Sequence, residues 1–158
     1  MGKYVLMLFI AAALITGCSS NDKQQTLEVR ENRTPFPPII EPHNPEQAEE
    51  SGDVVVLMGE MRNRVKWKKF VQNVKKHQPD QVRVTRYTIE GGPIIHELVY
   101  DGELIQSTYD DTRDMYGSRQ NKTPNTCTGI STMKSGGWRT FYILTGCEQE
   151  SRFSIPSK

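Results

Sequence analysis

Two cysteines near the C-terminal end, Cys127 and Cys147, are the first residues whose type suggests chemistry. Paired thiols either form a structural disulfide in an oxidising compartment or carry out redox catalysis. A redox-active pair commonly stands in a Cys-x-x-Cys arrangement, and neither cysteine belongs to one. The sequence therefore predicts a structural disulfide between Cys127 and Cys147.

A glycine-rich turn between the two cysteines supports this pairing. Residues 125–133 and 138–147 have the character of two strands, and Ser135-Gly136-Gly137 separates them. If Gly136 and Gly137 form the turn, the cysteines lie nearly opposite each other across the hairpin. Their Cα atoms would then fall within the roughly 4.4–6.8 Å that a disulfide requires. Closing a loop of this length contributes ~3 kcal/mol in the chain-entropy model.

The third cysteine, Cys18, stands at the end of a secretory signal. Lys3 and an apolar run over residues 4–13 have the layout of a signal peptide, and the run is too short to span a bilayer. Ile15-Thr16-Gly17-Cys18 resembles a bacterial lipobox, in which the cysteine thiol takes a diacylglycerol and the chain is cut before it. We expect a signal peptide over residues 1–17 and a lipid anchor, with palmitate-type acyl chains, on Cys18. An ordinary secreted protein or a retained anchor helix is the alternative.

Other residue types give little support for catalysis. His43 lies in a proline-rich stretch where we expect it to be solvated, and His77 lies near the end of a predicted helix. His96 lies in a predicted strand, with Glu97 on the opposite face. The chain has no Gly-x-Ser-x-Gly motif, no zinc-ligand spacing and no phosphate-binding loop. We expect a non-catalytic protein without a cofactor or metal; a small hydrolase is the less favoured alternative.

An acidic loop over residues 110–117 carries the carboxylates of Asp110, Asp111 and Asp114, together with Arg113. Three carboxylates can hold calcium. The alternating spacing and the distal glutamate of an EF-hand loop are absent, however. We expect a solvated loop with an Asp–Arg pair.

The charge balance excludes one class of partner. Of the 20 basic residues only Lys3 lies in the signal, so 19 basic and 19 acidic residues remain. A net charge near zero argues against a general nucleic-acid binder. We therefore expect no nucleic-acid partner.

Residues 18–52 are polar, acidic and rich in proline, which predicts a disordered tether between the anchor and the domain. The alternative is that residues 35–40, which mix proline with Phe36, Ile39 and Ile40, dock in the groove of a partner.

A basic amphipathic helix is predicted from Arg62 to Lys76, with Asn63 as the N-cap and Pro79 beyond its end. Its buried stripe comprises Trp67, Phe70, Val71 and Val74. The candidate anion-binding residues on its other faces are Lys66, Lys68, Lys69, Lys75 and Lys76. They could contact anionic lipid or an anionic wall polymer, each contributing ~1 kcal/mol. A solvated face without a ligand is the other interpretation.

The region after the helix predicts an antiparallel sheet. Strands are expected around residues 54–58, 82–89, 94–100 and 104–109, with a bulge or two-sided burial between Val84 and Tyr87. Asp101-Gly102 predicts a two-residue turn, and residues 151–155 are expected to form a last strand. Residues 53–158 are thus expected to form one α+β domain, with one helix packed on an antiparallel sheet of about five or six strands.

Several short motifs in this domain resemble small Bacillus-type lipoproteins that carry a domain of unknown function, numbered 4362. The resemblance covers residue 53 to about 155 and implies the same fold unit in a Gram-positive lipoprotein, without an activity to transfer. Gly92 stands where that pattern tends to have an acidic residue, which we expect to change only the turn. The motifs are Asp53-Val54-Val55, Phe70, Asn73-Val74, Tyr87-Thr88-Ile89-Glu90-Gly91, Pro93-Ile94, Tyr100-Asp101-Gly102, Thr108-Tyr109-Asp110, Arg113-Asp114, Tyr116-Gly117 and Thr145-Gly146-Cys147.

These features together predict a protein on the extracytoplasmic face of a bacterial cell membrane, held there by the lipid on Cys18. Its expected role is that of a tethered, non-catalytic binding or accessory module for a protein or wall component outside the membrane. The alternative role is an electrostatic adaptor that binds anionic lipid or wall polymer through the basic helix.

Overall fold

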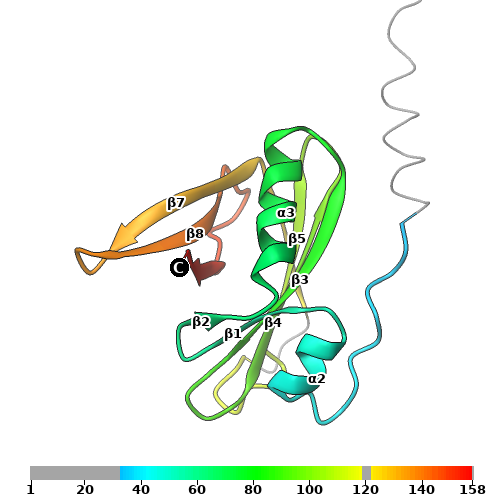
Figure 1. The fold of residues 1–158 in the computed structure, drawn as a ribbon, viewed down its shortest axis with the longest axis vertical. Helices are drawn as coiled ribbons and strands as arrows, with labels where there is room; N and C mark the ends of the chain where they lie inside the picture. The colour runs from blue at the N-terminus through cyan, green and yellow to red at the C-terminus, as the bar shows by residue number, and fades with distance from the viewer. Residues whose placement is uncertain (1–32, 119–121, 158) are drawn as a thin grey trace, which may run out of the picture.

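The computed structural model describes residues 33–118 and 122–157, so the predicted signal peptide and Cys18 lie outside the described residues. It has the predicted α+β architecture (Figure 1). The strands form two sheets rather than the single sheet expected. One sheet has six strands in the order β2-β1-β3-β4-β5-β6, and the other has three in the order β7-β8-β9.

The six-stranded sheet is built around the long hairpin of β3 (Asp80–Tyr87) and β4 (Pro93–Tyr100). On one side, β1 (Val54–Leu57) pairs in parallel with β3 and in antiparallel with the short β2 (Glu60–Met61). On the other side, β5 (Ile105–Asp110) and β6 (Thr123–Cys127) continue the antiparallel order.

Both faces of β3 are buried, which explains the irregular pattern between Val84 and Tyr87. The register of β3 with β4 is continuous, so the bulge that was one of the two expectations is absent. Val82 and Val84 belong to the main apolar core, whereas Arg83 and Thr85 are buried on the opposite face. The alternative expectation, burial on both sides, is confirmed.

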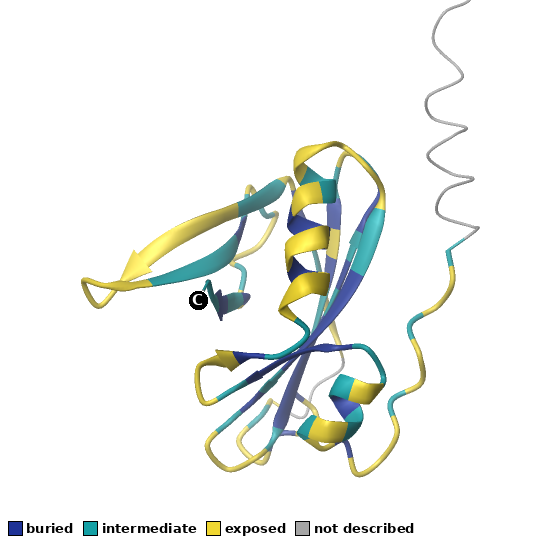
Figure 2. Ribbon diagram, in the orientation of Figure 1, coloured by how far each residue is buried: buried dark blue, intermediate teal, exposed yellow. Residues whose placement is uncertain are grey.

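Helix α3 (Arg64–Lys75) connects the parallel strands β1 and β3 and covers one face of the sheet (Figure 1). Trp67, Phe70 and Val71 are buried, as their spacing predicts, and Figure 2 shows the solvent side of the helix exposed. Asn63 takes the N-cap position, but its amide does not cap the helix. It donates instead to the carbonyl oxygens of Glu49 (3.1 Å) and Asp53 (2.7 Å).

The three-stranded sheet projects from the side of the molecule (Figure 1). Its strands are β7 (Gly129–Ser135), β8 (Arg139–Thr145) and β9 (Ser154–Pro156). The strand expected over residues 125–133 is therefore divided at Thr128 between β6 of one sheet and β7 of the other. Trp67 of α3 joins the two layers, because its ring lies 5.3 Å from that of Tyr142 and 5.6 Å from that of Phe153.

Residues 33–52 pack against the face of the large sheet opposite α3, so the expectation that they belong to a tether is wrong. The side chains of Gln81 and Arg83 donate to the carbonyl oxygens of Thr34 and Pro37. Helix α2 (Pro45–Glu50) begins at Asn44, whose Oδ1 accepts from the Gln47 N–H, and it buries Ala48 completely. Most of the prolines are exposed, and the segment is attached to the sheet through its carbonyl oxygens, His43 and Ala48.

Two turns differ from their expected form. The turn after β4 has Gly102 and Glu103 at its centre, because the Asp101 N–H bonds to the Leu104 carbonyl and the Asp101 carboxylate accepts from the N–H groups of Glu103 and Leu104. At Gly92, a Cβ atom would lie 2.2 Å from Asp114 Oδ1 and 2.8 Å from Asp114 Cα. An acidic residue there would require Asp114 to move, so Gly92 affects more than the turn.

Candidate functional site

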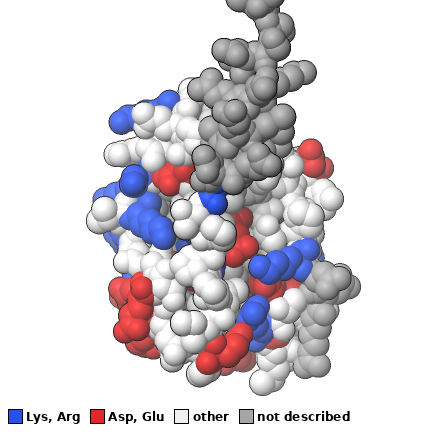
Figure 3. Space-filling view, turned by 90° about the vertical axis from the view of Figure 1, so that its right-hand side faces the viewer, with Lys and Arg blue, Asp and Glu red and all other residues white. Residues whose placement is uncertain are grey.

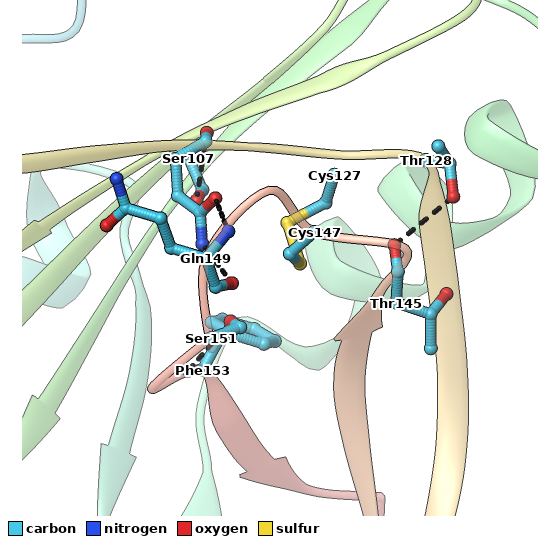
Figure 4. Close-up of a disulfide and its surroundings, with 9 residues drawn as sticks. Ser107, Cys127, Thr128, Thr145, Cys147, Gln149, Ser151 and Phe153 are labelled. Carbon is cyan, nitrogen blue, oxygen red and sulfur yellow. Dashed lines mark hydrogen bonds between the residues drawn. A yellow bond between two sulfur atoms is a disulfide. The ribbon is translucent and has the colours of Figure 1, made fainter.

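The predicted disulfide is present (Figure 4), although the Cα atoms of Cys127 and Cys147 are 3.9 Å apart, closer than the expected range of roughly 4.4–6.8 Å. The β7–β8 register pairs Ser135 with Arg139 and Gly129 with Thr145, and its continuation brings the cysteines opposite each other. Cys127 itself ends β6, so the disulfide connects the large sheet to the segment that follows β8. The bond is completely buried at Cys127, which fits a structural role.

The lysines of α3 lie on the surface, where they could meet an anionic partner. Lys66 Nζ donates to the carbonyl oxygen of Gly52. Among the described residues, the other four candidates take part in no ion pair, and they are Lys68, Lys69, Lys75 and Lys76. Figure 3 shows one group of Lys and Arg side chains at the upper left of the view and a second at the lower right, with Asp and Glu side chains close to both. The structure is therefore compatible with both interpretations of the basic helix.

The three aspartates of the acidic loop are buried rather than solvated, which corrects the expectation for residues 110–117, whereas Thr112, Arg113, Met115 and Tyr116 are exposed. Asp110, Asp111 and Asp114 are 4–8% exposed. Burial raises the pKa of Asp110 and Asp111, but hydrogen bonds from Thr112 and Ser118 outweigh it and hold both pKa values below the usual range. The expected Asp–Arg pair is present, with Arg113 Nη1 3.1 Å from Asp110 Oδ2.

The carboxylates of this loop are engaged in hydrogen bonds with neighbouring residues. Asp111 accepts from the N–H and the hydroxyl of Ser118, and Asp114 accepts from the Thr88 hydroxyl, so the carboxylates serve the loop's own fold. Within residues 33–118 and 122–157, no group of three or more His, Cys, Asp or Glu side chains could hold a metal ion.

A second buried polar cluster lies under residues 33–52. Arg83 Nε donates to Asp53 Oδ1 at 2.7 Å, and the Thr85 hydroxyl donates to Asp53 Oδ2 at 2.7 Å. His43 Nε2 lies 3.5 Å from the same oxygen and is buried, so the expectation that His43 is solvated is wrong. These side chains are at most 2% exposed, which leaves no access for a ligand and assigns the cluster to the fold.

The buried His96 belongs to a pocket that the sequence did not indicate. This pocket, called here the His96 pocket, lies between the sheet face and the segment after Cys147 and has a volume of about 490 Å³. Burial, and then the charge of Arg86, lower the pKa of His96 to about 3, so the imidazole is neutral at physiological pH. The lining residues are His96, Ser107, Tyr109, Thr123, Asn125, Gln149, Glu150, Ser151, Arg152 and Phe153.

A second hollow, called here the Trp138 groove, lies where the tip of the projecting hairpin faces the β1–β2 turn. Its volume is about 700 Å³. Trp138 is 77% exposed and Met58 94% exposed, and the Arg139 guanidinium lies 4.7 Å from the centre of the Trp138 ring. The lining residues are Val56, Met58, Gly59, Glu60, Arg86, Tyr87, Trp138, Arg139, Thr140, Phe141, Ser154 and Pro156.

No motif could have located either hollow, because each is assembled from segments that are far apart in the sequence. For the Trp138 groove the only sequence signal is a tryptophan beside a glycine turn, at a hairpin tip where a core residue is not expected. For the His96 pocket the signal is a histidine on the strand face that also carries Leu98 and Tyr100.

The fold and these sites define a small, disulfide-bonded α+β domain whose surface carries the His96 pocket and the Trp138 groove. Residues 51–141 match the family described as Domain of unknown function (DUF4362). Since the match covers more than half of the 158 residues, the chain belongs to this family, as its motifs predicted. No curated protein and no solved structure matches the chain. Within the described residues, no helix has the length and apolar character needed to cross a membrane.

Proposed function

We propose that this protein is a bacterial surface lipoprotein, anchored by a lipid on Cys18, that acts as a non-catalytic binding or accessory module. Its partner is another extracytoplasmic protein, which docks in the Trp138 groove. The Ile15-Thr16-Gly17-Cys18 motif supports the anchor. The residues of the groove support the docking.

The observation that carries this proposal is the set of large exposed side chains at one hollow. Trp138 and Met58 present apolar surface to solvent on its rim, and Arg139 stacks on the indole ring. Tryptophan, methionine and arginine are the residue types enriched in protein–protein interfaces, and tryptophan and arginine dominate their binding energy. Glu60 and Arg86 add one charge of each sign, which suits a mixed protein surface better than a polyanion.

Site-specific crosslinking tests the proposal in the cell. A photoreactive residue in place of Trp138 should capture one protein reproducibly, and the same residue in place of Tyr116 should not. Tyr116 is the matched control because it is also aromatic, is 75% exposed and does not line the groove. Capture should also fail with Cys18→Ala, because the anchor keeps the two proteins together.

Binding of the purified protein to the partner captured by crosslinking then decides the role of the Trp138 groove. Trp138→Ala should weaken binding at least ~10-fold, the change expected for a central interface tryptophan. Tyr116→Ala should change it by less than about twofold. Equal effects of the two substitutions would remove the groove from the interaction.

The second candidate function is an electrostatic adaptor to anionic lipid or wall polymer. The absence of ion pairs at Lys68, Lys69, Lys75 and Lys76 within the described residues favours it. Binding of anionic vesicles by the Cys18→Ala chain, which lacks the proposed lipid, should then fall steeply as salt rises, because exposed charges are screened beyond ~8 Å at physiological ionic strength. Replacing these four lysines and Lys66 with glutamine should abolish this binding. Vesicle binding that survives the substitutions would end this alternative.

A further inference from the structure

We propose that the His96 pocket is a binding site for a small, uncharged, polyhydroxylated ligand of the saccharide class, with the His96 imidazole hydrogen-bonded to a ligand hydroxyl at the floor of the pocket. The pocket shares no lining residue with the Trp138 groove, so this inference stands apart from the proposed protein partner.

The pocket is held in shape by covalent and hydrogen bonds. The Cys127–Cys147 disulfide fixes the start of the segment that forms one wall (Figure 4). Two residues further on, the Gln149 backbone exchanges two hydrogen bonds with the Asn125 side chain, at 2.9 and 3.1 Å. Ser151 and the buried Phe153 complete the wall. A preformed hollow of about 490 Å³ has the size of typical small-molecule sites.

His96 is the feature that points to a ligand. It is 3% exposed, and neither ring nitrogen has a hydrogen-bond partner among the described residues. The ring nitrogens are not among the fully buried polar atoms that lack a partner, so they remain accessible from the pocket, where a ligand hydroxyl can take the place of water. The ring is held between aromatic neighbours, with ring centres 5.2 Å from Tyr109 and 5.1 Å from Phe153. Its position is therefore fixed before a ligand arrives.

The lining selects against charged ligands. Arg152 and Glu150 are its only two ionised groups, they have opposite sign, and both are exposed at the rim. Arg152 also stacks over the Tyr109 ring at 5.1 Å and lies 4.0 Å from Asp111 Oδ2, so its charge is already partly balanced. An anion would approach a site backed by buried carboxylates, and a cation would meet the guanidinium.

The remaining polar groups match hydroxyls. A neutral imidazole offers one donor and one acceptor, as the hydroxyls of Ser107 and Thr123 also do, and each ligand hydroxyl can donate and accept. The Tyr109 and Phe153 rings supply apolar faces against which the C–H groups of a sugar ring can pack. A purely apolar ligand would leave the His96 ring nitrogens without a partner and is disfavoured, whereas the Ser107 hydroxyl already donates to the Asn125 carbonyl oxygen at 3.4 Å and keeps its acceptor capacity for a ligand.

Ligand-observed saturation-transfer NMR on the full chain tests this inference. The probes are glucose, N-acetylglucosamine and its β-1,4-linked dimer, with inorganic phosphate and cyclohexanol as charged and apolar comparisons. Phosphate binding is followed by its ³¹P linewidth. At least one saccharide should bind saturably below roughly 50 mM, and phosphate and cyclohexanol should not. Tighter binding of the dimer than of either monosaccharide would indicate a glycan chain as the natural source, and equal binding a free sugar.

Three variants locate the binding. His96→Phe keeps the ring packing but removes both hydrogen-bonding atoms and should weaken saccharide binding at least ~10-fold. Ser107→Ala, a smaller change, should weaken it severalfold. Thr108→Val, on the opposite face of the same strand, should leave it within about twofold. The inference is overturned if no saccharide saturates, if phosphate or cyclohexanol binds more tightly than every saccharide, or if neither pocket variant weakens binding.

Discussion

Arg83 carries a charge in the middle of a buried strand, and its partners explain how the fold accommodates it. Its guanidinium bonds to the Asp53 carboxylate and to the carbonyl oxygen of Pro37, and its side chain is 1% exposed. Taking such a pair out of water is costly unless its hydrogen bonds are well made. Here the pair also attaches residues 33–52 to the sheet, so a local electrostatic contact organises a whole segment.

Removing one member of this pair should be strongly destabilising. Asp53→Ala removes the hydrogen-bonded counter-charge of the buried Arg83 guanidinium and leaves only the longer 3.8 Å contact with Glu97, so we expect the free energy of unfolding to fall by about 3 kcal/mol. Urea unfolding followed by tryptophan fluorescence measures the change. The matched control is Glu49→Ala, which removes a half-exposed pair with Arg62 and should cost less than ~1 kcal/mol. Similar costs for the two variants would contradict the structural role of the pair.

His96 should make stability depend on pH. Its pKa is about 3 in the folded protein, and the unfolded value is near 6.5, so between these values the unfolded chain binds a proton that the native protein does not. The free energy of unfolding should therefore fall as pH is lowered from about 6.5 to about 3, with a slope of up to ~1.4 kcal/mol per pH unit from this group. Above pH 7 His96 is neutral in both the folded and the unfolded chain, so it no longer makes the free energy of unfolding depend on pH.

Urea unfolding at several pH values checks this dependence. The groups around the imidazole are the rings of Tyr109 and Phe153 and the charge of Arg86. Asp110 and Asp111 also lose stabilisation in acid, but below about pH 4, because their folded pKa values are lowered. His96→Phe should make the free energy of unfolding nearly independent of pH between pH 4.5 and 6.5. The loss of stability at lower pH should remain. An unchanged slope in that window would show that His96 is protonated in the native state.

Among individual residues, contacts within one hairpin could be predicted from the sequence, whereas contacts between residues of different elements could not. The pairing of Cys127 with Cys147 follows from the Gly136–Gly137 turn between them, because a hairpin register is set locally. The contacts of Arg83 with Asp53 and Pro37 join positions in different elements, and no local pattern encodes them. The burial of His43 was missed for the same reason.

Some helices and strands could be predicted from the sequence and others could not. The stripe of Trp67, Phe70 and Val71 predicts α3 and its buried face, since 3.6-residue spacing is a direct consequence of helix geometry. Composition misled the prediction for residues 33–52, because prolines that suit a flexible linker also suit an extended chain lying along a sheet. The division of residues 125–133 between two sheets was not foreseen, since both parts have the same strand character.

The disulfide should matter most to the projecting sheet. It closes a loop whose ends are 20 residues apart, which corresponds to about 3 kcal/mol of stabilisation. In Cys127→Ser/Cys147→Ser we expect amide hydrogen exchange to accelerate in β7 and β8, while β3 and β4 stay protected. Most members of the main core belong to α3 and the large sheet, although Leu144, Phe153 and Ile155 also join it, and β7 is largely exposed in any case (Figure 2).

Hydrogen exchange with peptide-level mass analysis measures this difference directly. The matched control is Ser131→Ala in β7, which alters the exposed strand without touching the disulfide. Uniform acceleration over all strands of the double serine variant would instead mean that the two sheets unfold as one cooperative unit.

For the whole molecule, the packing of residues 33–52 shortens the proposed tether. The chain from Cys18 to residue 33 can span at most about 50 Å when fully extended. A lipid on Cys18 would thus keep the domain close to the membrane, within reach of partners of similar height. The two hollows would then work in a layer next to the bilayer rather than at the outer limit of the wall.

The lipid anchor, rather than the basic helix, should hold the protein at the membrane. Each buried CH₂ contributes ~0.8 kcal/mol, so two or three acyl chains exceed the ~1 kcal/mol that each of the five lysines can add at low salt. Cys18→Ala should therefore move the protein from the membrane fraction to the soluble fraction and out of the detergent phase in Triton X-114 partitioning. The chain in which Lys66, Lys68, Lys69, Lys75 and Lys76 are all glutamine should stay in the membrane fraction at any salt concentration. Retention of Cys18→Ala in membranes washed with 1 M salt would contradict the anchor, because at that ionic strength charges are screened within ~3 Å and only apolar insertion remains.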